Sequence, residues 1–295
     1  MPLSKFCNFM EWFVLALLSA IFHTLFTLLI KIAANNERPE NIALASRIFA
    51  AIFLTLIFIY FPLEISFNLN FIIFTLATAL LGTAATILYA YALKKTDMSL
   101  VVPLLGMTPV ILCVIAILFL GEKVTLYNFL GILLVSVGIY FLNLKNLKEV
   151  LDPLKALVKN QGSRFALLVA LIYAFSASFD KLAIQSSNAL FFVLVYNWIT
   201  SFTTYIYTFV KKTDPLDFFK KRPIISVSLG VVSALILISQ MCAISLGNVS
   251  FVIPVKRMSA VFSVIAGYIY FKETKFKQRL FGSCLIVVGV SLLVL

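Results

Sequence analysis

The stretch Val249–Lys275, VSFVIPVKRMSAVFSVIAGYIYFKETK, decides the fold because it is a near copy of Met98–Val124, MSLVVPLLGMTPVILCVIAILFLGEKV. The two align without a gap, and the same register continues into the helix that follows each of them. Identical pairs are Ser99/Ser250, Val101/Val252, Pro103/Pro254, Met107/Met258, Val110/Val261, Glu122/Glu273, Gly131/Gly282, Leu134/Leu285, Val137/Val288, Gly138/Gly289 and Leu142/Leu293. The chain therefore contains an internal duplication.

Composition predicts a polytopic α-helical membrane protein. Hydrophobic residues make up 62% of the chain and charged residues 12%, whereas soluble domains are nearer one quarter charged. A membrane-spanning helix needs about 20 mostly apolar residues. Ten such runs are expected, at about 12–34, 40–61, 70–93, 98–120, 127–144, 165–185, 189–210, 223–246, 249–271 and 276 to the terminus. The first is interpreted as a helix and not as a signal peptide, because it is long enough to span and no small-residue cleavage site follows.

The ten runs divide into two halves of five. We expect residues 1–144 to form a first five-helix repeat, 145–164 a linker and 165–295 a second repeat. An odd number of spans per repeat inserts the second copy upside down, which is the inverted-topology arrangement of many transporters. The predicted fold class is an all-α integral membrane protein of ten transmembrane helices, a 5+5 inverted repeat around a central cavity.

The linker, KNLKEVLDPLKALVKNQGSR, is too polar to span a membrane. Its leucines and valines recur at helical spacing opposite lysines, so it could form an amphipathic helix on a surface rich in anionic lipid. A plain connecting segment is the alternative. Pro153 is expected to break such a helix into two pieces.

The net charge of +12 comes mainly from short loops on one side of the predicted spans. The positive-inside rule accounts for this bias, so nucleic acid is not expected as a partner. The chain is expected to be a multi-pass protein of the inner (plasma) membrane. The same rule places both of its termini outside the cytoplasm. The four cysteines show no CxxC or metal-like spacing and are interpreted as packing residues.

The repeated proline, the glutamate that ends the following run and the glycines seven apart carry a family resemblance. These residues are Pro103, Gly121, Glu122, Lys123, Gly131 and Gly138, then Pro254, Glu273, Gly282 and Gly289. At these positions the chain resembles the EamA-like branch of the drug/metabolite transporter superfamily. The resemblance implies a ten-helix carrier that moves small metabolites by alternating access, often as an exporter, with cytoplasmic termini. The second copy departs from it at Lys256, Arg257 and Lys272.

Lys256 and Arg257 stand where the first copy has the uncharged Leu105 and Gly106. A charge inside an apolar span is costly and marks a functional site by default. Asp180 is the expected partner of one of the two cations, because an unpaired buried charge costs several kcal/mol. The other cation, with Lys181 nearby, would attract a substrate carboxylate or phosphate. The alternative is that both cations only hold the helix; the functional interpretation is favoured.

Further candidates for substrate binding are polar residues deep in other spans. Arg47 has Asn197 as its approximate repeat counterpart, and a substrate contact or a helix–helix contact would explain both equally. Tyr89, near the repeat position of Gln240, is a weaker candidate for the cavity wall, and so is Gln240 itself.

Gating and proton transfer have their own candidates. His23 is the sole histidine and the natural proton relay, although a packing histidine is the commoner case. Lys31 could help to close a gate or could be an interfacial anchor. Pro103 and Pro254 should free backbone carbonyls in the core helices. Glu122 and Glu273 are interpreted as interfacial and structural.

No HExxH, Walker, nucleophile-elbow or Rossmann pattern occurs, so no enzyme, cofactor or metal is expected. The first hypothesis is a secondary transporter of a small polar metabolite with an anionic group, exporting or exchanging it. The alternative is a protein that translocates or binds a lipid headgroup or polyprenyl phosphate. A non-transporting scaffold is the third. Expected partners are a small-molecule substrate and the lipid bilayer. Whether the chain forms a homodimer is left open.

Overall fold

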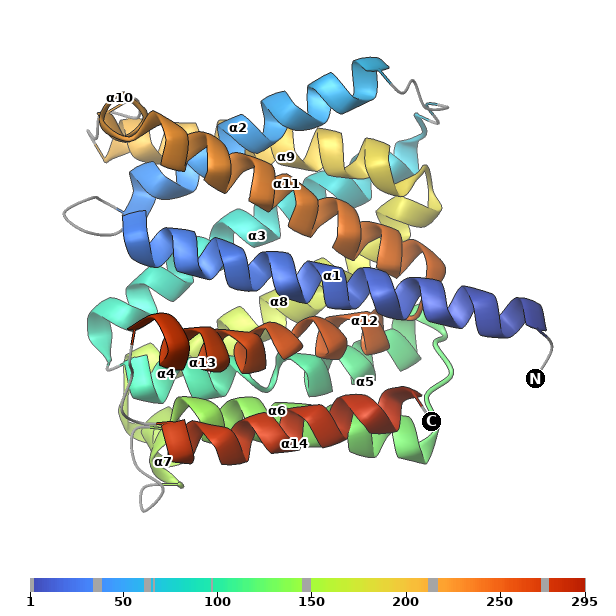
Figure 1. Cartoon of the computed structure of the whole chain (residues 1–295), viewed down its shortest axis with the longest axis vertical. Coiled ribbons are helices and arrows are strands. Elements are labelled where there is room, and N and C mark those ends of the chain that lie inside the picture. The colour runs from blue at the N-terminus through green and yellow to red at the C-terminus, as the bar shows by residue number, and fades with distance from the viewer. Residues whose placement is uncertain are drawn as a thin grey trace. The chain divides into compact units, whose positions relative to one another are not determined.

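The computed structural model describes residues 3–33, 39–60, 65, 67–96, 98–144, 150–211, 217–271 and 276–294. Throughout these ranges the regular structure is helical, with no β-strand (Figure 1). The helices of the first half are α1 Leu3–Ala33, α2 Pro39–Tyr60, α3 Leu69–Lys95, α4 Met98–Leu105, α5 Thr108–Leu120, α6 Leu126–Asn143 and α7 Asp152–Lys159. Those of the second half are α8 Gln161–Gln185, α9 Ala189–Val210, α10 Asp217–Lys221, α11 Pro223–Leu246, α12 Val249–Lys256, α13 Met258–Phe271 and α14 Phe276–Val294.

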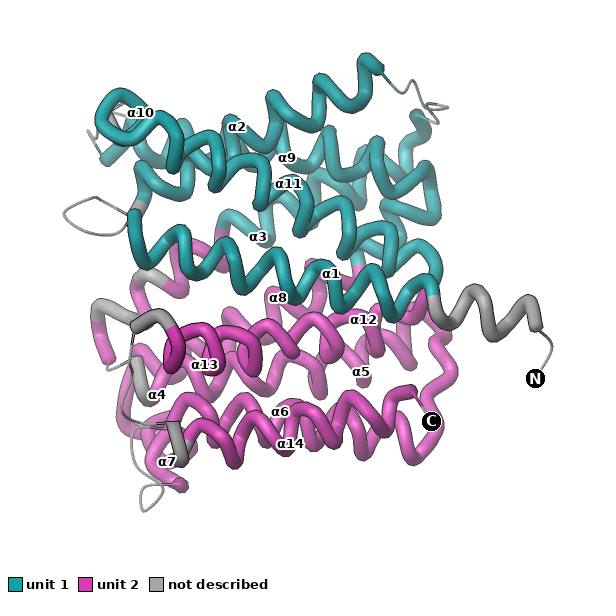
Figure 2. Tube along the Cα trace, in the orientation of Figure 1, with its two compact units in different colours: residues 1–83, 179–246 teal, residues 84–178, 247–295 magenta. Residues whose placement is uncertain are grey.

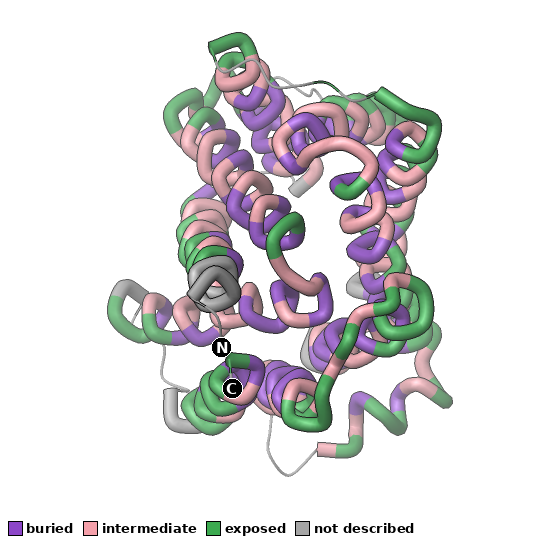
Figure 3. The backbone as a smooth tube through the Cα atoms, turned by 90° about the vertical axis from the view of Figure 1, so that its right-hand side faces the viewer, coloured by how far each residue is buried: buried purple, intermediate pink, exposed green. Residues whose placement is uncertain are grey.

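Nine stretches of the described residues are long and apolar enough to cross a membrane, and Arg279–Val294 is a shorter apolar helix. Together they match the ten predicted spans, five in each half. Many large apolar side chains are exposed along them, for example Leu118 and Phe119, each 71% exposed. Buried and exposed positions share the same helices, as Figure 3 shows. Such a surface suits hydrocarbon, which solvates an apolar side chain that water would not.

Spans four and nine are each broken one turn after the repeated proline. The N–H of Gly106 donates to the Pro103 carbonyl at 3.0 Å, and the N–H of Arg257 donates to the Pro254 carbonyl at 3.0 Å. Each of these bonds spans three residues where an α-helix spans four, so the helix tightens and then restarts as α5 or α13. The predicted interruption of both core helices is confirmed.

Glu122 caps the start of α12. Its carboxylate accepts hydrogen bonds from the N–H of Val249 at 2.7 Å and of Ser250 at 3.1 Å, and the Ser250 hydroxyl also donates to it. The N-cap residue, Asn248, makes no side-chain cap of its own. A carboxylate at a helix N-terminus satisfies orphan N–H groups and complements the helix dipole. Glu122 thus has a structural role, as predicted, which is to cap α12. Glu273 lies outside the described residues.

The chain divides into two compact units (Figure 2). Unit 1 comprises Met1–Thr83 and Phe179–Leu246, and unit 2 comprises Ala84–Ser178 and Gly247–Leu295. The divisions fall within α3 and α8, so each unit contains helices from both halves of the sequence. The repeat boundaries at 144 and 165 stay a prediction, since these units group helices by packing.

In unit 2, α6 and α14 pack along their whole length through glycines. A Cβ added to Gly138 would lie 2.7 Å from the Gly282 carbonyl oxygen, and one added to Gly131 would lie 2.7 Å from that of Gly289. Backbones approach this closely only where side chains are absent. Because the lower-numbered glycine of one helix meets the higher-numbered glycine of the other, the two repeat-equivalent helices are antiparallel. This is the relation expected of an inverted repeat.

Unit 1 repeats that relation with α2 and α9, the second helices of the two halves. Arg47 lies against Thr200, while Thr55 accepts a hydrogen bond from the Trp198 indole at 3.0 Å. The Phe58 and Phe191 rings are 6.0 Å apart, centroid to centroid. The residue number rises along α2 as it falls along α9, so these helices are also antiparallel.

The described part of the linker holds the short helix α7. Leu157 packs against a buried cluster of α3, α4 and α8 that contains Ala92, Val101, Leu104 and Ala166. On the opposite face Leu151, Leu154 and Val158 are exposed, and Val158 is 77% exposed. The helix is amphipathic as predicted. Its position on a membrane surface stays a prediction.

Pro153 lies in the first turn of α7, which begins at Asp152. At that position proline breaks no helical hydrogen bond and its φ angle already suits a helix. Residues 145–149, which would form most of the piece before the proline, lie outside the described residues. The expected division of the linker helix at Pro153 therefore stays a prediction.

Candidate functional site

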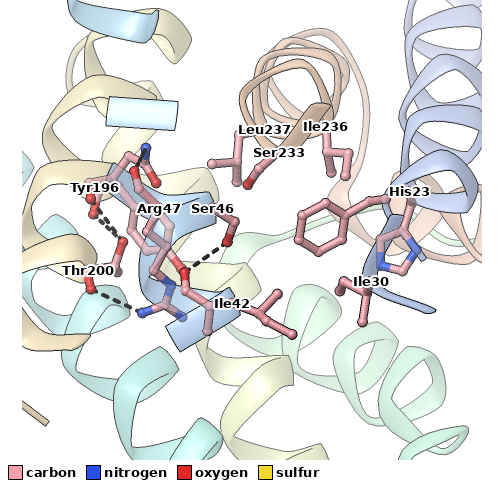
Figure 4. A pocket seen from close by; sticks show the side chains of 13 residues that line it. His23, Ile30, Ile42, Ser46, Arg47, Tyr196, Thr200, Ser233, Ile236 and Leu237 are labelled. Carbon is pink, nitrogen blue, oxygen red and sulfur yellow. Dashed lines mark hydrogen bonds between the residues drawn. The ribbon is translucent and has the colours of Figure 1, made fainter. Parts of the chain in front are cut away.

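Unit 1 contains a cavity of about 510 Å³ between α1, α2, α9 and α11 (Figure 4). Small-molecule sites usually enclose roughly 300–1,000 Å³. The lining residues are His23, Phe26 and Ile30 of α1, Ile42, Ala43, Ser46 and Arg47 of α2, Tyr196, Asn197 and Thr200 of α9, and Ser233, Ile236 and Leu237 of α11. The four helices come from both sequence halves, so the cavity depends on the complete chain.

Arg47 is held on the α9 side of this cavity. Its Nη1 donates to the Thr200 carbonyl oxygen at 3.1 Å and to the Thr204 hydroxyl. The side-chain amide of Asn197 donates to the Arg47 carbonyl oxygen at 3.3 Å. These bonds join the two repeat counterparts and fix the guanidinium beside the cavity. In Figure 4 Arg47 lies next to Thr200 and Tyr196.

Among the thirteen lining residues, the side chains that can carry a positive charge are His23 and Arg47, and none of the thirteen has a carboxylate. The hydrogen bonds described for the Arg47 guanidinium all involve Nη1 and uncharged oxygens. A guanidinium whose hydrogen-bond partners are all uncharged has no negative charge to compensate its own in a medium of low dielectric constant. The cavity wall is therefore suited to an anion.

The wall opposite Arg47 is mostly apolar, with His23 among its residues. In Figure 4 Ile30 and Ile236 lie near His23, away from the Arg47 guanidinium. Phe26 and Ile30 also pack against a buried cluster whose members are Ala33, Ile42, Ala45, Phe218 and Leu229. Phe218, contributed by the short helix α10, is completely buried there. The cavity thus has a cationic side and a hydrocarbon side, with the latter supported by a packed cluster.

Three of the predicted site residues, His23, Arg47 and Asn197, are brought together in this cavity. Asp180 and Lys181 belong to unit 1 but do not line it. The Asp180 carboxylate accepts a hydrogen bond from the Thr78 hydroxyl at 2.6 Å, and the Lys181 ammonium donates to the Ile244 carbonyl oxygen. Gln240 is buried on α11 without being a lining residue.

Lys256 and Arg257 belong to unit 2, at the break between α12 and α13. Both are partly buried. The Arg257 Nε is buried and has no hydrogen-bond partner among the described residues. The expected pairing of Asp180 with one of these cations stays a prediction, since Asp180 belongs to the other unit.

The remaining candidates also lie outside the cavity wall. Tyr89 packs against the buried cluster that holds Leu157, and Pro103 and Pro254 are buried inside their helices. Lys31 is exposed in the last turn of α1. No group of three His, Cys, Asp or Glu side chains that could hold a metal occurs within the described ranges.

The family comparison matches both halves of the chain. The model of the EamA-like transporter family aligns with residues 10–144 and again with residues 160–295. The chain belongs to the EamA-like transporter family. The resemblance drawn from the repeated proline, glutamate and glycines is confirmed, and the chain is a membrane transporter of the drug/metabolite type.

Two further comparisons agree with this family's architecture. Uncharacterized protein MJ1333.1 of Methanocaldococcus jannaschii is 31% identical over 133 residues, which are 45% of this chain and 96% of that protein. It therefore has about the length of one repeat. A solved crystal structure, described only as that of a protein, matches with a TM-score of 0.75 over 95% of each chain at 10% identity. At that identity the likeness concerns the fold alone.

Sequence reasoning about this EamA-like chain missed four polar residues of the cavity, namely Ser46, Tyr196, Thr200 and Ser233. One signal could have found part of the set. Asn197, Thr200, Thr204 and Thr208 recur at helical spacing on α9, and all are buried. A buried polar stripe on a membrane helix must face protein or a water-filled space, which points toward Arg47. On α11, Ser226 and Gln240 lie seven residues before and after Ser233 and are both buried, which is a second signal of the same kind.

Proposed function

We propose that this EamA-like chain transports a small metabolite with an anionic group by alternating access, driven by a gradient or by exchange. Arg47 is the residue that holds the anion. One observation carries the proposal: a cation deep in a membrane-spanning unit faces a cavity of metabolite size, and no carboxylate stands among the residues that line it. An arginine can bind a carboxylate or phosphate through two hydrogen bonds.

The surroundings of Arg47 support a role in recognition. Thr200 and Thr204 engage a single nitrogen of the guanidinium. Such support fixes the side-chain direction and keeps charge available for a second partner. His23 lines the same cavity and is proposed as the group through which a proton could be coupled to transport. Lys256 and Arg257 stay candidates for a second anion contact.

The test is counterflow of labelled metabolites in proteoliposomes, with the native chain, Arg47→Gln and Arg47→Lys. Removing one partner of a buried charged hydrogen bond costs about 2 kcal/mol or more, or roughly thirtyfold in affinity. We expect Arg47→Gln to reduce anion transport by that factor and Arg47→Lys to retain part of it. Lys159→Gln, which removes an exposed charge on α7, should leave transport unchanged.

Two results would contradict the proposal. If Arg47→Gln is folded and fully active, Arg47 is structural. Alternatively, the same liposomes could move a fluorescent phospholipid across the bilayer while no soluble metabolite moves. The lipid-headgroup alternative would then replace the proposed metabolite transport.

A further inference from the structure

We infer that the cavity selects monocarboxylates with an apolar body, such as branched or aromatic 2-oxo acids, over the corresponding amino acids. This inference rests on the proposed function and specifies its substrate class. It narrows the expectation of a small polar metabolite with an anionic group to a ligand that also has an apolar body. Three properties of the cavity carry the inference: the charge of its wall, the division of that wall into two sides, and the cavity volume.

The charge of the wall separates an anion from a zwitterion. Arg47 can neutralise one carboxylate, but an amino acid also brings an ammonium group. No lining residue carries a negative charge that could pair with it. Hydroxyl oxygens of Ser46 and Ser233 could accept hydrogen bonds from the ammonium group, yet they would leave its charge uncompensated in a medium of low dielectric constant. A 2-oxo acid brings no such charge.

The neighbouring hydroxyl groups leave Arg47 as the donor for a carboxylate. The Ser46 hydroxyl donates to the Ala43 carbonyl at 2.8 Å, and the Thr200 hydroxyl donates to the Tyr196 carbonyl at 3.0 Å. Since a hydroxyl has a single hydrogen, these two groups can only accept from a ligand. The preference for an oxo acid over an amino acid therefore rests on the charge of the wall.

The rest of the wall offers hydrocarbon to the body of the ligand. Phe26, Ile30, Ile42, Ile236 and Leu237 supply apolar side chains, and Figure 4 shows Ile30 and Ile236 across the cavity from the Arg47 guanidinium. An apolar chain or ring gains from leaving water for such a wall. The volume of about 510 Å³ is ample for a ligand with a branched or aromatic body.

The experiment compares matched ligand pairs as inhibitors of counterflow by the native chain. The pairs are 4-methyl-2-oxopentanoate with leucine, and phenylpyruvate with phenylalanine, with 4-methylpentanamide as the uncharged control. We expect each oxo acid to act at a concentration at least about tenfold lower than its amino acid. The amide, which lacks the charge, should be inactive in the same range.

A charge added to the wall provides the decisive variant. Ser233→Asp would place a carboxylate on α11, and we expect it to shift the oxo-acid to amino-acid ratio toward the amino acid by about tenfold or more. Ser245→Asp, at an exposed position of the same helix, is the matched control and should keep the native ratio. If Ser233→Asp does not fold, as judged by size-exclusion chromatography, the ratio of the native chain decides alone.

The outcomes separate this inference from the proposed function. If leucine or phenylalanine equals or exceeds its oxo acid and still requires Arg47, the substrate class is wrong and the proposed function stands. If no carboxylate acts and Arg47→Gln changes nothing, both fail. If the native chain prefers the oxo acids and Arg47→Gln loses that preference, the proposed function and this inference are both supported.

Discussion

Unit 1 and unit 2 bring repeat-equivalent helices together in opposite ways. In unit 2, α6 and α14 meet glycine to glycine, with no room for a single added carbon. In unit 1, α2 and α9 meet through Arg47, Asn197 and Thr200, and a cavity lies beside them. One duplicated sequence has therefore become a close-packed helix pair in one place and a polar, hollow pair in another. The difference teaches that one duplicated repeat can use one of its helices for close packing and another to line a polar cavity.

The largest effect is expected from a single carbon in the close-packed pair. Gly138→Ala would put a Cβ 2.7 Å from the Gly282 carbonyl oxygen and 2.7 Å from an Ile286 side-chain carbon. Overpacking of this kind typically costs about 1–3 kcal/mol. We expect a clear fall in the melting temperature of the detergent-solubilised protein, followed by tryptophan fluorescence.

The matched control is Gly82→Ala on α3. Its added Cβ would come no nearer than 3.4 Å to the Tyr196 hydroxyl, an ordinary contact. Alanine is also favoured over glycine inside a helix by up to about 1 kcal/mol. This variant should be as stable as the native chain or slightly more so. Equal destabilisation by both variants would remove the distinction between the two units.

A smaller effect, on function and not on stability, is expected when the cavity is filled. Ser233→Leu would extend an apolar side chain from α11 into the space beside Ile236 and Leu237. We expect transport to fall about tenfold, equivalent to about 1.4 kcal/mol. The melting temperature should stay within a few degrees of the native value, because no packed contact is displaced. Unchanged transport with the leucine in place would show that substrate passes elsewhere.

The smallest effect concerns the cap on α12. Glu122→Gln keeps the shape of the side chain but removes its charge, and with it the preference for the N–H groups of Val249 and Ser250. Loss of a helix cap typically costs about 0.5–2 kcal/mol, and an amide oxygen should retain part of the cap. Thermal unfolding should show a modest decrease, absent from Glu11→Gln at an exposed position of α1. A decrease of the same size in both variants would argue against capping.

The sequence was sufficient to predict the spans. Helices α9 and α11 begin and end at the residues expected from their apolar runs, Ala189–Val210 and Pro223–Leu246. Hydrocarbon thickness sets the length of a spanning helix, so composition alone locates it. The interruptions near Pro103 and Pro254 were equally predictable, because a proline inside a helix removes one backbone hydrogen bond and kinks or breaks the helix.

The cavity could be predicted only in part. The depth of Arg47 and its repeat relation to Asn197 marked both as candidates, and the structure joins them. Depth does not tell which way a side chain faces, however. From the sequence, Lys256 and Arg257 were stronger candidates for the anion contact than Arg47. Tyr196 and Ser233 enter the wall through packing between helices far apart in the sequence. No local pattern records such packing.

The glycine contacts between α6 and α14 are reciprocal: Gly131 meets Gly289, and its repeat equivalent Gly282 meets Gly138. Each helix thus presents the same surface to the other. A polypeptide with one repeat would carry that surface once, and could complete the contact only with a copy inserted in the bilayer the other way up. Fusion of the two copies into one chain fixes a single orientation for each copy. In a fused chain the two copies can carry different residues at related positions, so that α2 carries the charge of Arg47 and α9 carries the Asn197 amide that binds the Arg47 backbone.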